Sequence, residues 1–239
     1  LNTEKDEAFE IKSTAINALY SRAFELAQKG ELVVSNDEMT GVQAREQKHP
    51  AKPTMAGKPR LVEYEYIRHG TLSFIVSFNV SLGGVILATS GPTRKEEDYV
   101  AHIMLLVHSH PEIKRWHIVA DNLNTHCSES LVRFVAAESD LDIDLGTKGV
   151  SGILKSMKSR ADFLGDPEHR IVFYYTPKHA SWMNQVEIWF SILARKLLRK
   201  GNFTSKEDRR NKVMRFIDYY NETMAKPFKW TYGGKALSV

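Results

Sequence analysis

The sequence predicts an α/β domain built on a mixed sheet flanked by helices. Between residues 60 and 89, three β-rich runs are separated only by short breaks at His69-Gly70 and at Gly83, which favours an antiparallel meander. Further along, two apolar strands alternate with amphipathic helices, the order typical of a parallel sheet. The length of 239 residues suits one domain of about 150–250 residues with an insertion.

The elements of the first half follow from the spacing of apolar residues and from the residues that interrupt it. Apolar positions three and four apart indicate helices, short apolar or β-branched runs indicate strands, and proline with glycine indicates loops. In order, the predicted elements are a helix at Asp6–Lys29, a strand at Glu31–Asn36 that carries Asp37 at its far end and breaks at Thr40-Gly41, a loop at His49–Pro59, strands at Arg60–Arg68, Leu72–Val80 and Gly84–Thr89, and a helix at Lys95–His110 closed by Pro111.

The second half alternates strands and helices around one segment of different character. That segment, Asp140–Arg170, contains a basic amphipathic stretch at Ser151–Leu164 and a Gly165-Asp166-Pro167 stop, so it is predicted to be an insertion. The remaining predicted elements are a strand at Trp116–Ala120 that ends in Asp121, a helix at Ser128–Ala137, a strand at Ile171–Tyr175, a helix at Trp182–Lys200 and a last helix at Ser205–Tyr220.

Composition excludes several classes of protein. Hydrophobic residues make up 42% and charged residues 26%, which argues against disordered, collagenous and disulfide-scaffold chains. The longest apolar stretch, Ser73–Ala88, is interrupted by polar residues and glycines, so no membrane span is expected. One cysteine, Cys127, and a charged start predict an intracellular, reducing compartment, and because the first methionine is Met39 we expect the natural protein to begin upstream.

The charge is distributed unevenly along the chain. Residues 1–147 carry 15 basic and 21 acidic residues, a net charge of −6, whereas residues 148–239 carry 18 and 8, a net charge of +10. A basic half on a chain of net charge +4 is the electrostatic pattern of a polyanion-binding surface, although a well-solvated surface gives the same pattern.

Three carboxylates are candidates for chemistry. Asp37 and Asp121 follow strands, where an aspartate is commonly a turn former or a helix cap. If the two strands are parallel neighbours, however, the carboxylates face each other, an arrangement that favours a hard cation between them. Glu187 projects from the apolar side of its helix, where a glutamate is either paired with a buried base or bound to metal. Two aspartates and a glutamate on separate elements fit a site that holds two Mg²⁺ ions for phosphodiester attack.

The surroundings of these carboxylates resemble a known family. The strings VVSNDEMTGVQAREQKHPAKP, HIVADNLNTH and TPKHASWMNQVEIWFSILARKLLRKGNF resemble the catalytic blocks of IS630-type transposases, and FIDYYNETMAKPFKWTYGGK resembles the end of the same family. These insertion-sequence enzymes belong to the Tc1/mariner superfamily of DDE enzymes, which have the ribonuclease H-like fold. The match runs in order from about Glu31 to Lys235, and it implies a catalytic and metal-binding triad of Asp37, Asp121 and Glu187.

The resemblance also implies an activity, a cofactor and partners. Such an enzyme hydrolyses a phosphodiester at the transposon end and joins the freed 3′-hydroxyl to target DNA, usually at a TA step. It uses two Mg²⁺ ions, for which Mn²⁺ can substitute. Its expected partners are double-stranded DNA and a second copy of itself when assembled on that DNA, and its expected place is the prokaryotic cytoplasm, on the nucleoid.

Two departures from the family pattern define the expected domains. Asp121 and Glu187 are 66 positions apart, longer than in most relatives, and the excess falls in the 140–170 segment before the last catalytic helix. The family's N-terminal helix-turn-helix region is absent, so residues 1–30 are expected to be a leading helix or a linker from it. Residues 31–239 then form the catalytic domain.

Several further residues are candidate DNA contacts. Asn122, Asn124 and His126 directly follow the second aspartate, where they position phosphate or water, or else only form a polar loop that caps the next helix. Lys178, His179 and Trp182 precede the Glu187 helix and are candidates to clamp a strand end, although a tryptophan in this position is more often a core residue. Lys155, Lys158 and Arg160 on the insertion form a cationic face that either holds DNA or decorates the surface. His108 and His110 form an H-x-H pair without cysteine or acidic partners nearby in sequence, so zinc is not expected.

Two other functions stay open at this stage. A ribonuclease H-like nuclease would share the triad but would release its products without strand transfer. An inactive DNA-binding remnant would keep the basic half, but it would have no reason to retain three carboxylates in these places.

Overall fold

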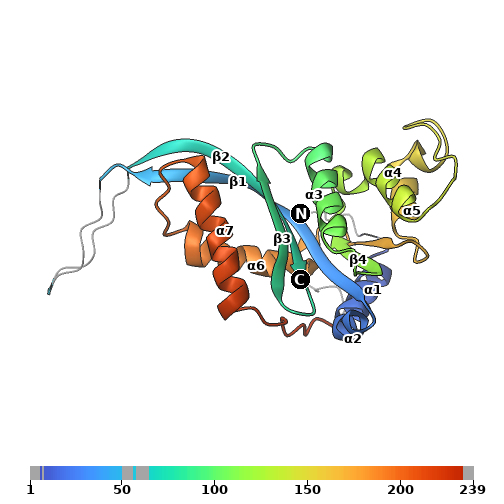
Figure 1. The fold of residues 1–239 in the computed structure, drawn as a ribbon, viewed down its shortest axis with the longest axis horizontal. Helices are drawn as coiled ribbons and strands as arrows, with labels where there is room; N and C mark the ends of the chain where they lie inside the picture. The colour runs from blue at the N-terminus through green and yellow to red at the C-terminus, as the bar shows by residue number, and fades with distance from the viewer. Residues whose placement is uncertain (1–5, 7, 50–55, 58–64, 234–239) are drawn as a thin grey trace.

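A five-stranded mixed sheet forms the centre of the protein in the computed structural model, which describes residues 6, 8–49, 56–57 and 65–233 (Figure 1). The strands are β1 (Glu31–Gln47), β2 (Tyr66–Asn79), β3 (Gly84–Gly91), β4 (Arg115–Ala120) and β5 (Ile171–Tyr175), and their order in the sheet is β3-β2-β1-β4-β5. β1, β2 and β3 pair antiparallel, whereas β1, β4 and β5 run parallel. The predicted mixed sheet is therefore confirmed.

Helices cover both faces of this sheet. They are α1 (Phe9–Ser21), α2 (Ala23–Gln28), α3 (Glu96–His108), α4 (Glu129–Glu138), α5 (Met157–Leu164), α6 (Val186–Leu193) and α7 (Lys206–Thr223). Short 3₁₀ turns lie at η1 (Asn124–Cys127), η2 (Ile153–Lys155) and η3 (Ser181–Met183), and a π-helical turn, η4 (Ala194–Leu198), continues α6. Within the described ranges, no helix combines the length and apolarity needed to cross a bilayer.

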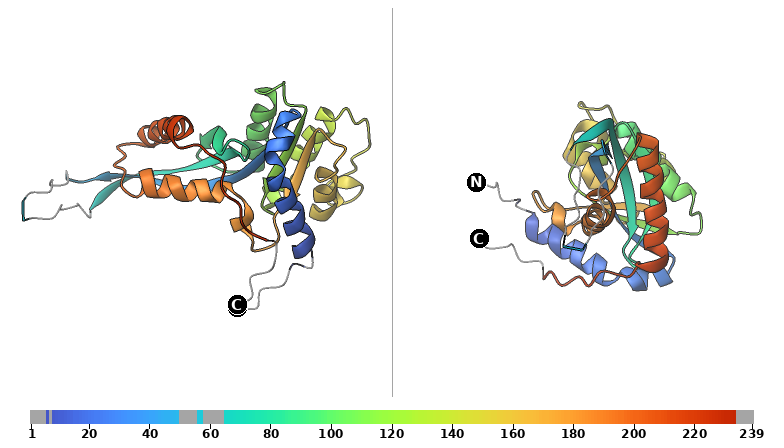
Figure 2. Two further views of the ribbon diagram at one scale, coloured as in Figure 1. Left: turned by 90° about the horizontal axis from the view of Figure 1, so that it is seen from below. Right: turned by 90° about the vertical axis from the view of Figure 1, so that its left-hand side faces the viewer.

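Alternation along the strands assigns the helices to the two faces, because successive side chains of a strand point in opposite directions. Leu32, Val34 and Ile118 belong to a core cluster with α3, α4 and α5. Val33 and Val119, of the opposite parity, pack with α1 and α2. On that second face, the far part of the sheet packs on α6 and α7. The result is a helix–sheet–helix sandwich, as Figure 2 shows from two further sides.

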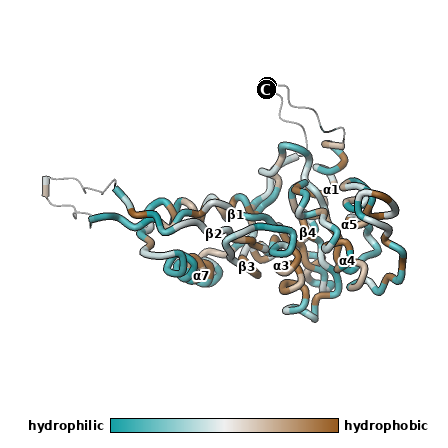
Figure 3. Tube along the Cα trace, turned by 90° about the horizontal axis from the view of Figure 1, so that it is seen from above, coloured by the Kyte–Doolittle hydropathy of each residue, from teal (hydrophilic) through white to brown (hydrophobic). Residues whose placement is uncertain are grey.

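β1 and β2 extend as a long two-stranded ribbon beyond the other strands (Figures 1 and 2). The predicted break at Thr40-Gly41 is wrong: β1 continues to Gln47, because β2 supplies hydrogen-bond partners and a register shift between Met39 and Val42 absorbs the irregularity. Gly41 takes a φ of 65° there. Apolar residues gather where strands meet helices, and the outer part of the ribbon is mainly hydrophilic (Figure 3).

The predicted separation of Arg60–Arg68 from Leu72–Val80 is also wrong in its described part. Residues 66–79 form the single strand β2, in which Gly70 passes through a φ of 94° without ending the pairing with β1. Residues 60–64 and most of the loop predicted at 49–59 lie outside the described residues.

Two predicted helices are divided in the structure. The leading helix breaks at Arg22, whose amide bonds to Leu19 O at 3.2 Å and tightens the turn between α1 and α2. The helix predicted to start at Trp182 begins instead at Val186, after the 3₁₀ turn η3. Both leading helices pack on the sheet.

The segment at 140–170 lies between α4 and β5 and contains η2 and α5. The predicted stretch Ser151–Leu164 is interrupted at Ser156, whose hydroxyl accepts from the Ser159 amide at 3.1 Å and begins α5. Leu154 and Leu164 are buried against the α3–α4–α5 side of the sheet. The segment is thus packed onto the domain.

Candidate active site

Two of the predicted carboxylates meet at one edge of the parallel strands. β1 and β4 pair from Glu31 to Ser35, with Ser35 opposite Val119, so Asp37 and Asp121 come two residues later on neighbouring strands. Asp37 is 6% exposed, whereas the Asp121 side chain is 30% exposed. Oxygen atoms of Asp37 and Asp121 and a ring nitrogen of His126 all lie within 4.8 Å of one another.

His126 is held between two carboxylates. It belongs to the turn η1 that follows Asp121, and its side chain is fully buried. Its Nδ1 lies 2.7 Å from Asp121 Oδ1, and its Nε2 lies 3.1 Å from Glu38 Oε2. With both ring nitrogens facing carboxylates, His126 supports Asp121 rather than offering a free lone pair to a metal.

Glu38 enters the site from the other face of the sheet. It follows Asp37 in β1, so the two side chains point in opposite directions. The Glu38 side chain is 2% exposed, and its Oε1 has no hydrogen-bond partner among the described residues. Sequence reasoning missed Glu38, although an acidic doublet at the end of a buried strand is a signal that could have identified it.

The electrostatics of the cluster follow from burial and proximity. Burial, and then the charge of Asp121, raises the pKa of Asp37 to about 7. Burial disfavours a charged His126, yet its contacts with Asp121 and Glu38 raise the pKa of His126 to about 10. Burial acts against ionised Asp121, but the hydrogen bond and the charge of His126 hold its pKa below the usual value. The cluster therefore contains one ionised carboxylate beside one that is easily protonated.

Glu187 stands in the first turn of α6, half-buried. Burial, and then the charge of Asp121, raises the pKa of Glu187. Glu187 therefore lies within electrostatic range of Asp121, but its oxygens are outside the 4.8 Å cluster. The structure thus brings the three predicted carboxylates to one region, with Asp37 and Asp121 closest together.

Asn184 fixes the start of α6 against β1. Its Nδ2 donates to Asn36 O at 2.8 Å and to Asp37 Oδ2 at 3.3 Å, and its Oδ1 accepts from the Ser35 hydroxyl. The Ser35 Oγ in turn accepts from the Val186 amide at 2.8 Å. Because Asn184 is fully buried, these bonds define where Glu187 stands relative to Asp37. Asn184 was not singled out from the sequence.

A groove of about 320 Å³ opens beside Asp121, at the ends of β4 and β5. Asn122, Lys178 and His179 line it, and Lys178 and His179 are exposed. Asn122 donates to Thr176 O, which fixes the loop after β5 to the loop after β4. Trp182 follows in η3 and is 38% exposed, with its ring 4.6 Å from that of Tyr232. We refer to the groove beside Asp121 as the β5 groove.

The remaining candidates divide by exposure. Lys155 and Lys158 are exposed, and Lys158 pairs with Asp162 at 2.6 Å. Arg160 is 6% exposed, and its Nε donates to Cys127 O at 2.5 Å, so the expectation that it adds to an outward cationic face is wrong. The burial of His126 likewise argues against the expected DNA contact.

His108 and His110 each contact a glutamate, and Glu112 is only two residues from His110, so the expectation that no acidic residue lies near this pair in sequence is wrong. His108 Nε2 lies 2.9 Å from Glu138 Oε1, and His110 Nδ1 lies 3.2 Å from Glu112 Oε1. The possible metal clusters found among the described residues do not include either histidine.

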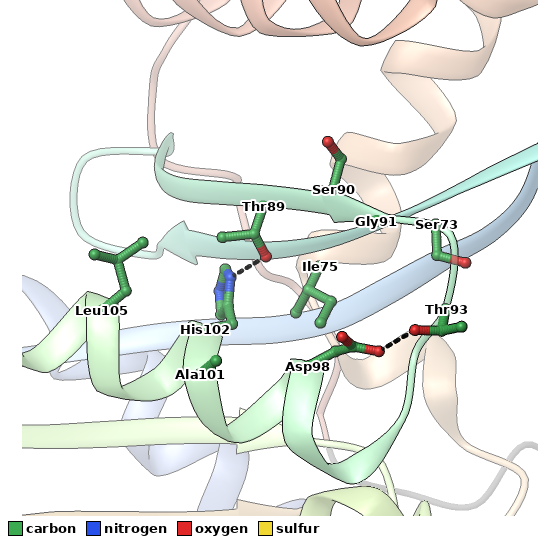
Figure 4. Close-up of a pocket in the computed structure, with 10 residues that line it drawn as sticks. All are labelled: Ser73, Ile75, Thr89, Ser90, Gly91, Thr93, Asp98, Ala101, His102 and Leu105. Atoms are coloured by element: carbon green, nitrogen blue, oxygen red, sulfur yellow. Dashed lines mark hydrogen bonds between the residues drawn. The ribbon is translucent and has the colours of Figure 1, made fainter. Parts of the chain in front are cut away.

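A separate cavity of about 230 Å³ lies between α3 and the β2–β3 strands (Figure 4). His102 faces it, with Nδ1 2.8 Å from Thr89 Oγ1 and Nε2 2.8 Å from Ser77 Oγ. Burial lowers the pKa of His102 to about 3, so the ring is neutral and both nitrogens are satisfied. This histidine ties α3 to the sheet.

Comparison with known protein families finds a match over most of the chain. The family described as DDE superfamily endonuclease matches residues 32–210, about three quarters of the chain. That span contains Asp37, Asp121 and Glu187. A comparison with curated protein sequences finds no match.

Solved structures share the fold at low sequence identity. The mariner Mos1 paired end complex with Mn is 15% identical, with a TM-score of 0.54, and the match covers 93% of this chain and 57% of that one. The Mos1 strand transfer complex is 14% identical, with a TM-score of 0.54 and coverages of 91% and 56%. The catalytic domain of Mos1 mariner transposase is 14% identical, with a TM-score of 0.51 and coverages of 93% and 85%.

These similarities establish the architecture. The five-stranded mixed sheet with helices on both faces is the ribonuclease H-like fold of the Mos1 catalytic domain. The chain spans a little over half the length of the protein chain in the Mos1 complexes.

Proposed function

Because this chain belongs to the DDE superfamily of endonucleases, we propose that it is the catalytic domain of a metal-dependent DNA transposase of the IS630 type. It hydrolyses phosphodiesters at transposon ends and joins the 3′-hydroxyl to target DNA. The observation that carries the proposal is the meeting of Asp37 and Asp121 at the ends of neighbouring parallel strands, with Glu187 beside them on α6.

The residues present fit a divalent cation. Two carboxylates with oxygens inside a 4.8 Å cluster repel each other unless a proton or a cation lies between them. The pKa of Asp37 is raised first by burial and then by this repulsion from Asp121. Oxygen donors of this kind suit Mg²⁺ or Mn²⁺. Asp37, Asp121 and Glu187 would hold two ions, which when bound supply the Lewis acidity that activates a water or hydroxyl and stabilises the leaving oxygen.

The protein's own groups contribute position and charge. Asp121 stays ionised because His126 pairs with it, and His126 is itself fixed by Glu38. Asn184 holds Asp37 and the start of α6 in one hydrogen-bonded unit, so Glu187 is presented from a fixed helix. Lys178 and His179 line the β5 groove, where they offer contacts to a DNA strand that enters beside Asp121.

The proposal also covers the binding partners of the protein and its location in the cell. Mos1 structures include a paired-end complex with the left transposon end and a strand transfer complex. By analogy we propose double-stranded DNA as substrate, a TA target step and a homodimer on DNA. We further propose that residues 1–30 connect to a DNA-recognition region and that the protein acts in the prokaryotic cytoplasm, on the nucleoid.

A cleavage and joining assay tests the proposal. Mn²⁺ or Mg²⁺ should support nicking of plasmid DNA and joining of a pre-cut 3′ end to it, and excess chelator should abolish both. Asp37→Asn, Asp121→Asn and Glu187→Gln should each remove cleavage while circular dichroism shows an intact fold. Nicking without joining would favour a nuclease, and no cleavage by the folded wild-type chain with either metal would reject the proposed activity.

A further inference from the structure

A second groove runs along the edge of β1 beyond the carboxylates. β4 pairs with β1 only as far as Ser35, so from Asp37 onward β1 has no parallel neighbour on that side. Further along β1, the Phe203 amide donates to Arg45 O at 2.8 Å. Between these points lies a groove of about 300 Å³, lined by residues 39–43 and 45 of β1, by the end of η4 and by α7. We refer to it as the β1 groove.

Three arginines face the β1 groove. Arg45 comes from β1, Arg199 from the residue after η4, and Arg209 from the first half of α7. Arg45 and Arg199 are exposed. In the part of the chain that the structure describes, the arginines that pair with carboxylates are others: Arg22, Arg133, Arg170 and Arg210. The groove therefore gathers three guanidinium groups that pair with no carboxylate of the described residues.

Arg209 is the unusual member of this set. It is 3% exposed, and its Nε has no hydrogen-bond partner among the described residues. Its guanidinium carbon lies 4.3 Å from the ring centre of Phe203, a contact that gives no hydrogen bonds. Burial, and then the charge of Arg45, lowers the pKa of Arg209 to about 10. A buried cation next to another cation is unfavourable unless an anion is bound.

We propose that the β1 groove binds a phosphate of the DNA backbone, with Arg209 as the buried anchor and Arg45 and Arg199 at the rim. The proposal rests on the proposed function, in which DNA is the substrate. A guanidinium presents two parallel N–H groups that match two phosphate oxygens, which makes arginine the residue suited to this anion. A bound phosphate would supply the counter-charge that the described residues do not provide for Arg209.

The position of the β1 groove fits a phosphate on the same duplex as the reacting bond. Its β1 residues begin two positions after Asp37 and end eight positions after it. At about 3.3 Å per strand residue, this is roughly 7–26 Å from the carboxylates. At about 3.4 Å per base pair, the distance corresponds to roughly two to eight base pairs. Because the β5 groove lies on the opposite side of Asp121, the two grooves flank the carboxylates.

The experiment measures DNA binding as a function of salt. The 239-residue chain and its Arg45→Gln, Arg199→Gln and Arg209→Met variants are titrated with a fluorescent duplex at salt concentrations between about 50 and 200 mM. The matched control is Arg133→Gln, which removes an exposed guanidinium on α4 that pairs with Glu129. Each groove variant should weaken binding roughly tenfold and reduce the slope of log affinity against log salt by about 0.9. The control should leave both unchanged.

Thermal unfolding separates a binding role from a structural one. Without DNA, Arg209→Met should raise the Tm, because it removes an uncompensated buried charge and keeps the side-chain volume. A structural role predicts the reverse, a lower Tm with unchanged DNA affinity. If Arg209→Met does not fold, Arg45→Gln and Arg199→Gln still decide the matter, since both replace exposed side chains.

The outcomes distinguish this inference from the proposed function. A wild-type chain that nicks and binds DNA, with groove variants of wild-type affinity and salt slope, overturns only the phosphate site. A wild-type chain that neither nicks nor binds DNA overturns the proposed function as well. A further experiment measures the Tm in the presence of inorganic phosphate. If phosphate raises the Tm of the wild type but not of Arg209→Met, and the groove variants bind DNA normally, then the groove binds a small anion. In that case the assignment to DNA is wrong.

Discussion

The imidazole of His126 and the carboxylate of Asp121 form an ion pair, with 2.7 Å between Nδ1 and Oδ1. The other ring nitrogen faces Glu38, whose side chain lies on the opposite face of the sheet from Asp37. His126 therefore links an acidic residue of the candidate site to a second acidic residue buried behind it. This relationship explains why a residue expected to touch DNA is fully buried.

Removing the charge of His126 should weaken metal binding. His126→Gln keeps a hydrogen-bonding side chain but no longer fixes Asp121 by charge. Because loss of a group that orients a metal ligand typically reduces metal affinity or activity 10–100-fold, we expect a loss of about that size in Mn²⁺ affinity and in cleavage. Isothermal titration with Mn²⁺ gives the first value and plasmid nicking the second. Glu38→Gln should act in the same direction, and unchanged Mn²⁺ affinity in a folded His126→Gln would contradict the role.

Asp37 should make the metal-free protein less stable as the pH rises from about 4 to about 7. Its pKa in the folded state is about 7, against 3.8 when unperturbed. The folded state therefore holds this proton after the unfolded state has lost it, so the contribution is present below pH 4 and is lost as the pH rises through 7. The raised pKa of His126 also lowers the stability as the pH rises, but only above about pH 6.5.

Thermal unfolding in chelator checks this pH dependence. The Tm difference between Asp37→Asn and the wild type should grow in favour of the variant between pH 4.5 and 6.5, at roughly 2–4 °C for each kcal/mol. Adding Mn²⁺ should raise the Tm of the wild type but not that of Asp37→Asn, because only the wild type offers the second carboxylate. A pH-independent difference would show that Asp37 does not retain its proton.

Asn184→Ala should reduce both stability and cleavage. It removes bonds from Asn184 to Asn36 O and Asp37 Oδ2 and leaves the Ser35 hydroxyl without its acceptor. We expect the free energy of unfolding to fall by about 2 kcal/mol. Asn221→Ala is the matched control, since Asn221 bonds to the Val85 amide and carbonyl at 2.9 and 2.8 Å on the β3 side of the sheet. Both variants should unfold at lower denaturant concentration, but only Asn184→Ala should reduce kcat, and equal kcat values would refute the positioning role.

The insertion should show two separable kinds of cation. Reversing Lys155 and Lys158 to glutamate changes exposed charges, so we expect weaker DNA binding at an unchanged Tm. Arg160→Gln should instead lower the Tm, because it removes the bonds from Arg160 to Cys127 O and to Leu154 O. Thermal unfolding and duplex titration of both variants give the comparison. Normal DNA affinity after the double reversal would show that the insertion only covers an edge of the domain.

Much of the fold was accessible from local patterns. Apolar spacing located β4, β5, α3 and α4 within one or two residues, because each element buries a face whose period is visible in the sequence. The ends of helices and strands were harder to predict where tertiary contacts override local sequence signals. Gly41 and Gly70 suggested breaks, but hydrogen bonding between β1 and β2 carries both strands past them.

The same reasoning applies to the candidate site. Asp37, Asp121 and Glu187 stood out because a carboxylate at a strand end or on an apolar helix face is visible in one segment. Glu38, Asn184 and Arg209 did not stand out, because each is defined by a partner, or by the lack of one, more than 80 residues away or on another element. Lys158 and Arg160 illustrate the difference, since both are cations of one short helix and only the latter is buried.

The sequence by itself determined the order of strands and helices and the three carboxylates that mark their ends, because backbone periodicity and chain order are local properties. The tertiary structure decided which carboxylates approach within a metal-binding distance and that His126 supports Asp121 from within. It also decided that Arg209 is buried with no counter-ion among the described residues. Desolvation and charge pairing depend on what is packed around a group, and that packing arises only when β1, β4, α6 and α7 come together.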